Sequence, residues 1–167
     1  KSSAASDVYK RQVIALRNKY YPSVKISVLS NSTMIDRPAV AEALLKVDNN
    51  ILKLDSAVDA TMRLIDRPAN KEFTVEHVVG HLKKFRHQCI IQTMMVRGEH
   101  DGVRIDNTTD AEIQALLKAY LEIEPAEVML YSLDRPTPEQ RLQKVERDEL
   151  ERIAEVFRQK GIKVQVN

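Results

Sequence analysis

LKLDSAVDATMRLIDRP, residues 52–68, joins a short strand pattern to a short helix pattern, and this order decides the fold. Apolar and charged side chains alternate at its start. Leu52 and Leu54 therefore face one side of the predicted strand, and Lys53 and Asp55 face the other. A strand that leads into a helix is the repeating unit of a parallel sheet. The stretch thus predicts a βα unit with charged side chains where its strand ends.

The same alternation of strand and helix patterns recurs on both sides of this stretch. Short β-branched runs predict five strands: KISVLS, ILKLD, CIIQTMMV, EVMLYS and IKVQV. Apolar stripes predict a helix in PAVAEALLKV and a short one over Ser56–Ile65. Thr74 is the N-cap of a third helix that reaches Phe85, and the capping box of Thr109 and Glu112 opens a fourth that reaches Tyr120. The last helix runs from Leu150 to Phe157, and Gly161 is placed to end it. The order predicts an α/β fold with parallel strands and alternating helices, either an open sheet or a partial (β/α) barrel.

Composition sets limits on the function. The chain has 167 residues, of which 30% are charged, and its net charge of +2 gives no support for nucleic acid or a membrane surface as partner. No apolar run is long enough to cross a bilayer and no signal peptide is evident, so a cytoplasmic protein is expected. Cys89 is the single cysteine, which excludes an internal disulfide and a cysteine-built metal site in this chain.

The first residues differ from the rest. KSSAASDVYKRQ, residues 1–12, shows no periodicity and runs directly into the helical pattern that begins at Val13. We interpret residues 1–12 as a non-native leader, either a translated library adapter or a disordered polar segment. The domain itself is expected over residues 13–167, as the C-terminal portion of a longer protein.

Polar residues gather where the predicted strands end. Ligands of parallel α/β folds bind at the carboxyl ends of the strands. Lys53 is costly inside such a strand unless a carboxylate or a polar ligand meets it, and an acid of a neighbouring strand or a ligand would both serve. The strand-end residues are Ser30, Asn31, Ser32, Lys53, Asp55, Ser56, Gln92, Arg97, Glu99, Tyr131, Ser132, Asp134 and Arg135.

The tripeptide Asp-Arg-Pro occurs three times, and its surroundings differ. Turn chemistry before a helix explains the first, so Arg37 is expected at the surface. Arg67 follows a short helix and precedes a loop, which makes it a candidate clamp for an anion. Asp134 and Arg135 follow a strand directly and are either ligand-facing or paired with each other.

Other reactive side chains are better explained by structure than by chemistry. His77 and His81 are four residues apart on one predicted helix, but they lack the pattern of a zinc protease and are expected at the surface. Cys89 is expected to be a small buried side chain. The methionines Met94, Met95 and Met129 are expected in the core.

Four stretches carry a resemblance to a known family: ISVLSNSTMIDRPAVAEAL, ILKLDSAVDATMRLIDRP, VVGHLKKFRHQCIIQTMMVRG and EVMLYSLDRPTPE. In order and spacing, from about Val13 to the C-terminus, they resemble the radical S-adenosylmethionine (radical SAM) enzymes. The resemblance implies a partial (β/α)6 barrel, with these five strands as its third to sixth strands and a trailing edge strand. It also implies reductive cleavage of S-adenosylmethionine by a 4Fe-4S cluster to give a 5′-deoxyadenosyl radical.

The resemblance also implies roles for particular residues. Asn31 matches the family's asparagine after the third strand, whereas Ser30 and Ser32 replace its threonine and glycine. Lys53 and Asp55 match residues expected near the ribose or the methionine moiety of the cosubstrate. Arg67 matches the arginine of the family's Arg-Pro and would pair with the methionine carboxylate. Together with the strand-end positions, this gives the expected cofactor-binding residues Ser30, Asn31, Lys53, Asp55, Arg67, Gln92 and Tyr131.

The family's cluster ligands do not occur in this chain. Its C-x-x-x-C-x-x-C loop and its Gly-Glu motif are missing, and Cys89 alone cannot ligate a cluster. We therefore expect the C-terminal part of a radical SAM enzyme, inactive and free of iron by itself, with a small-molecule cosubstrate and an unidentified substrate. No catalytic residue and no metal ligand is assigned to it. The alternative is a complete α/β domain that binds a small ligand or acts as a scaffold, without redox chemistry.

Overall fold

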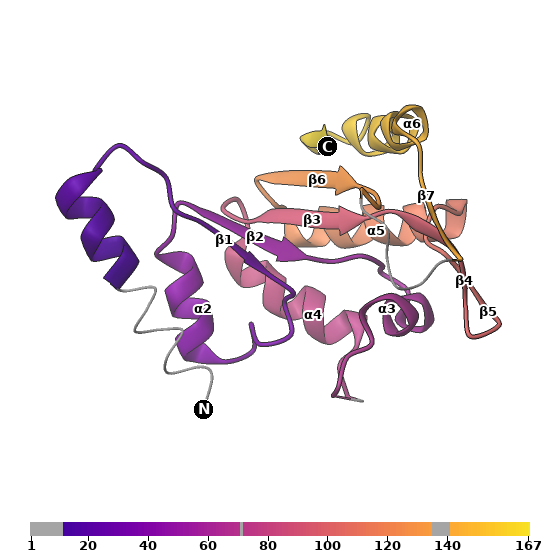
Figure 1. The fold of residues 1–167 in the computed structure, drawn as a ribbon, viewed down its shortest axis with the longest axis horizontal. Helices are drawn as coiled ribbons and strands as arrows, with labels where there is room; N and C mark the ends of the chain where they lie inside the picture. The colour runs from indigo at the N-terminus through magenta and orange to yellow at the C-terminus, as the bar shows by residue number, and fades with distance from the viewer. Residues whose placement is uncertain (1–11, 71, 135–140) are drawn as a thin grey trace.

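The computed structural model describes residues 12–70, 72–134 and 141–167. Its main element is a parallel sheet with the strand order β1-β2-β3-β6-β8 (Figure 1). The strands are β1 Ser27–Ser30, β2 Asn49–Lys53, β3 Ile90–Met94, β6 Glu127–Tyr131 and β8 Val164–Val166. All five predicted strands are present, and the α/β prediction with parallel strands is confirmed.

Helices separate the strands of this sheet. Residues 12–20 are helical, so Gln12 belongs to a helix, and the rest of the predicted leader lies outside the described residues. The others are α2 Pro38–Leu45, α3 Asp59–Asp66, α4 Val75–Leu82 with a 3-10 turn Lys83–Phe85, α5 Asp110–Ile123 and α6 Arg147–Arg158. None of the helices in the described ranges combines the length and the apolarity that a bilayer span requires.

Local signals fix the helix ends much as the sequence predicted. The Thr74 hydroxyl accepts a hydrogen bond from the backbone N–H of His77, and Thr109 caps α5 in the same way. After α6 the chain turns at Gly161, whose φ of +81° favours glycine. The helix predicted over Ser56–Ile65 begins three residues later, at Asp59, because the Ser56 hydroxyl accepts from the N–H of Val58 and forms a turn there.

The two faces of the parallel sheet differ in burial. Side chains such as Leu52, Ile91 and Val128 point to one face and join the helices in a single apolar core. In that core the rings of Tyr120 and Phe157 pack edge to face with 5.1 Å between their centroids. The side chains of the other face are half-buried, and we call it the open face. It carries Lys53, Gln92, Met94, Met129 and Tyr131.

The methionine prediction is therefore only partly correct. Met95 is fully buried, whereas Met94 and Met129 lie on the open face and not in the core. Strand alternation is the reason, because both occupy positions whose neighbours in sequence point into the helices.

A second sheet was not predicted. It is antiparallel, with the order β5-β4-β7, and consists of β4 Val96–His100, β5 Val103–Asp106 and β7 Leu142–Lys144. The strand predicted over CIIQTMMV ends earlier than expected, because β3 ends at Met94 and Val96 already begins β4, which pairs with β5 and β7. Figure 1 shows the β4–β5 hairpin projecting beyond the carboxyl ends of the parallel strands.

Candidate functional site

Lys53 is the last residue of β2 and is held between two carboxylates. Its Nζ lies 2.7 Å from Asp55 Oδ2 and 3.0 Å from Asp66 Oδ1. The side chain of Asp55 is fully buried, while Lys53 keeps 27% of its side-chain surface exposed. Of the two partners predicted for Lys53, a carboxylate or a polar ligand, the structure shows carboxylates. Neither comes from a neighbouring strand, because Asp55 lies two residues after the end of β2 and Asp66 is the last residue of α3.

Lys53, Asp55 and Asp66 form a triad, and buried polar contacts hold the backbone around it. Asp55 Oδ1 accepts a hydrogen bond from the N–H of Met94 at 2.9 Å, which ties the end of β2 to the end of β3. The Ser56 hydroxyl donates to Glu112 Oε2 at 2.7 Å. The carboxylate predicted for the capping box thus anchors the β2–α3 turn to α5. These bonds fix where the Lys53 ammonium points.

Burial and charge act in opposite directions within the triad. Burial disfavours the charged form of Lys53, but the carboxylates of Asp55 and Asp66 outweigh it and raise the lysine pKa above its ordinary value. Burial raises the pKa of Asp55 to about 7, with Lys53 opposing the shift and Asp66 adding to it. The triad therefore combines a firmly charged ammonium with a carboxyl group that binds a proton readily.

The Asp55 carboxyl makes stability depend on pH with a definite sign. Its pKa is about 7 in the folded protein against 3.8 ordinarily, so between these values the folded state binds more protons than the unfolded chain. Its contribution to the free energy of unfolding is full below about pH 4 and is lost as the pH rises towards 7. We expect the stability advantage of wild type over Asp55→Asn to shrink over this range. Urea unfolding at several pH values measures it, and a constant difference would contradict the assignment.

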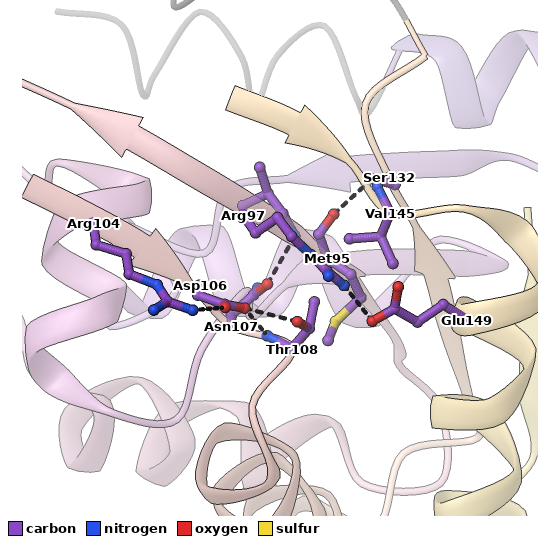
Figure 2. Close-up of polar contacts among 10 residues, drawn as sticks. Met95, Arg97, Arg104, Asp106, Asn107, Thr108, Ser132, Val145 and Glu149 are labelled. Carbon is purple, nitrogen blue, oxygen red and sulfur yellow. Dashed lines mark hydrogen bonds and ion pairs between the residues drawn. The ribbon is translucent and has the colours of Figure 1, made fainter. Parts of the chain in front are cut away.

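Asn107 connects this triad to the antiparallel sheet. Its side-chain amide donates to Asp55 O at 2.8 Å and to Met94 O at 2.7 Å, and its Oδ1 accepts from the N–H of Val96 at 2.8 Å. Asn107 is fully buried. Figure 2 shows it beside Asp106 at the base of the hairpin. No sequence pattern predicts a role for Asn107, because its three hydrogen-bond partners come together only in the fold.

The structure brings several predicted residues to one place. Lys53 is in register with Gln92, and Met94 with Tyr131, so these side chains share the open face at the carboxyl end of the sheet. Burial raises the Tyr131 pKa, and the nearby Asp55 carboxylate adds to the shift. Lys53, Asp55, Gln92 and Tyr131 thus form one cluster, which we call the strand-end cluster.

The turn after β1 adopts the conformation that a glycine would favour. Ser32 has a φ of +63° although it is not glycine, and it is almost fully buried. Its N–H donates to Ser30 Oγ, and Asn31 Oδ1 accepts from the N–H and hydroxyl of Thr33. Ser32 Oγ is a buried oxygen with no hydrogen-bond partner among the described residues.

The predicted arginines lie further out. Arg37 is exposed, as expected. Arg67 is also exposed and forms the left-handed C-cap of α3, one residue after Asp66. Asp134 is exposed, and Arg135 lies outside the described residues, so neither of the two alternatives for this pair is tested. A role in ligand binding for Arg67 stays a prediction.

The histidine and cysteine assignments concern groups away from the strand-end cluster. Cys89 is fully buried, and burial raises its thiol pKa to about 12. The rings of His77 and His81 lie 4.5 Å apart between centroids on α4, where His77 is exposed and His81 half-buried. Within the described ranges, no three His, Cys, Asp or Glu side chains are grouped so that they could hold a metal ion.

Comparison with solved structures identifies the fold. The chain is similar to a radical SAM methyltransferase from Sphaerobacter thermophilus, with a TM-score of 0.58 and 21% identity over 85% of this chain and 40% of that one. It is similar to a domain of pyruvate-formate lyase-activating enzyme from Bacteroides vulgatus, with a TM-score of 0.66 and 10% identity over 100% of this chain and 94% of that one. It is also similar to SuiB from Streptococcus suis, with a TM-score of 0.64 and 13% identity over 95% of this chain and 35% of that one.

These neighbours are radical SAM enzymes, and the family resemblance found in the sequence agrees with them. At such identities the likeness establishes the fold: a five-stranded parallel sheet with alternating helices, as in part of their barrel. The chain spans 40% of the length of the methyltransferase. No protein-family model matches the sequence, and no curated protein does so either.

Proposed function

We propose that this chain is the later part of a radical SAM barrel and that its strand-end cluster binds S-adenosylmethionine. The observation that carries the proposal is the lysine of the cluster, which is fixed by two carboxylates on the open face of the sheet. Gln92 and Tyr131 lie beside it at the carboxyl end, where ligands of parallel α/β folds bind. The solved neighbours, all radical SAM enzymes, support the assignment.

Each residue of the cluster has a distinct part in this proposal. The Lys53 ammonium has three donors, of which Asp55 and Asp66 engage two, so one remains for the methionine carboxylate of the ligand. Gln92 offers an amide and Tyr131 a hydroxyl to the ribose or the adenine. Asp55 is fully buried and therefore positions the lysine without touching the ligand.

The residues present do not fit a 4Fe-4S cluster. Such a cluster needs several thiolates, whereas this chain has one cysteine, buried and with a raised pKa. In the proposal the three cysteines come from another segment of the complete enzyme. The cluster, once bound there, supplies the electron that cleaves S-adenosylmethionine.

Anaerobic reconstitution tests the proposal. We expect the 167-residue chain, incubated with iron and sulfide, to show no iron–sulfur absorbance and to produce no 5′-deoxyadenosine with dithionite. A polypeptide that adds the contiguous upstream coding sequence should show both. A cluster on the short chain, or none on the extended one, would refute the assignment.

A second candidate is a complete α/β domain that binds a small ligand without redox chemistry. The structure that favours it is the separately crystallised Bacteroides vulgatus domain, of which this chain covers 94%. The upstream DNA separates the two candidates, because only the radical SAM proposal requires an in-frame three-cysteine loop.

A further inference from the structure

One face of the antiparallel sheet is composed of charged and polar side chains. Strand alternation places Arg97 and Glu99 of β4 on the same side as Arg104 and Asp106 of β5. With Arg141 and Gln143 they line a groove of about 550 Å³, which we call the arginine groove. On the other side of this sheet Val96 and Ile105 are buried.

A glycine allows the third strand to lie close to β4. Gly98 has a φ of +136°, and a Cβ placed on it would lie 2.2 Å from the carbonyl oxygen of Arg141. Any other residue would push the backbone at Arg141 away from β4. Gly98 therefore brings Arg141 into the groove, next to the arginines of the hairpin.

Arg97 is the most enclosed arginine of the groove. Its guanidinium pairs with Glu149 of α6, as Figure 2 shows, and only a third of its side chain is exposed. Its Nε is buried and has no hydrogen-bond partner among the described residues. A buried donor without a partner is costly, and Arg97 thus keeps a donor that its pair with Glu149 does not use.

The other two arginines are held by pairs that a ligand can exchange. Arg104 pairs with Asp106, and Arg141 pairs with Glu99. The side chains of Arg104 and Arg141 are 82% and 73% exposed, and ion pairs between exposed groups contribute little to stability. The lining itself holds three guanidinium groups and two carboxylates, and the third carboxylate, Glu149, pairs with Arg97 from α6.

We propose that the arginine groove binds a phosphate or carboxylate group of the substrate. Guanidinium groups bind both oxoanions with paired hydrogen bonds. The hairpin begins two residues after β3 ends, so the groove lies at the same end of the protein as the strand-end cluster. The assignment of the anion to the substrate rests on the proposed function, whereas the binding of an anion does not.

Calorimetric titration of the 167-residue chain tests this proposal. Inorganic pyrophosphate and citrate serve as probes, with sodium chloride keeping the ionic strength constant. We expect saturable binding that weakens at least about tenfold in Arg104→Gln/Arg141→Gln, since charge-assisted hydrogen bonds are lost. The tighter probe identifies the group as phosphoryl or carboxylate.

Arg86→Gln is the matched control. Arg86 is also an exposed, ion-paired arginine, but it precedes β3 at the opposite end of the sheet. Its removal should leave pyrophosphate and citrate binding within about twofold of wild type, and thermal unfolding should show that all variants remain folded. Absence of saturable binding, or an equal loss in Arg86→Gln, would overturn the groove assignment. Neither result depends on S-adenosylmethionine, so a failed cosubstrate titration leaves this test intact.

Discussion

Asn107→Ala is expected to lower the free energy of unfolding by about 3 kcal/mol, since each buried partner that loses its hydrogen bond costs about 1 kcal/mol or more. The substitution leaves three backbone groups without their partner, namely Asp55 O, Met94 O and the N–H of Val96. Asn107 is fully buried, so water cannot replace the amide without rearrangement. Urea denaturation followed by circular dichroism measures the change.

Two further variants make the interpretation specific. Asn49→Ala removes an amide that is only half-buried and donates to the Ser27 hydroxyl, so less than about 1 kcal/mol should be lost. Asn107→Asp keeps an acceptor for Val96 but places carboxylate oxygen against two carbonyls, so it should destabilise at least as much as alanine. Equal losses in Asn107→Ala and Asn49→Ala would show that Asn107 does not connect the strands.

The parallel sheet was predictable because its signals are local. Alternation within a strand, an apolar stripe along a helix and a hydroxyl cap such as Thr109 each involve residues close in sequence. Leu150, Ile153, Ala154 and Phe157 are all buried, as the stripe predicted. Parallel strands end at one edge, so the nearness of Lys53 and Gln92 also followed from the pattern.

The antiparallel sheet was missed although one signal was present. Asp101 and Gly102 both have positive φ, at 49° and 76°, and Asp-Gly is a strong signal for a two-residue hairpin turn. The strands beside it are polar, and one of them pairs with β7, more than 40 residues along the chain, so periodicity did not reveal them. The arginine groove depends on that distant pairing.

The partner of Lys53 shows a similar limit. A carboxylate was required by the cost of burying an ammonium, but its identity depended on where α3 ends. In the second Asp-Arg-Pro tripeptide the pattern predicts a role for Arg67 and none for Asp66. The contact at 3.0 Å arises because the last turn of α3, which contains Asp66, lies beside the end of β2. Sequence pattern does not fix that path.

Lys53→Met is expected to weaken S-adenosylmethionine binding by at least about tenfold, because a charge-assisted hydrogen bond contributes roughly 1.5–3 kcal/mol. It should also lower the free energy of unfolding by about 2 kcal/mol. The fully buried Asp55 carboxylate loses its counter-charge in this variant. Because Lys53 is 27% exposed, the loss of stability is smaller than for a fully buried ion pair. Calorimetric titration and urea unfolding of the 167-residue chain measure the two effects.

A double variant separates binding from folding. In Lys53→Met/Asp55→Asn no charge is left unpaired at position 55, so much of the stability should return while the cosubstrate affinity stays low. Lys163→Met, which removes an exposed lysine paired with Glu127, should change both quantities little. If Lys53→Met bound S-adenosylmethionine as tightly as wild type, the triad would be an ion pair that only stabilises the fold. The proposal that the strand-end cluster binds S-adenosylmethionine would then be wrong, because it rests on the Lys53 ammonium that the two carboxylates fix on the open face.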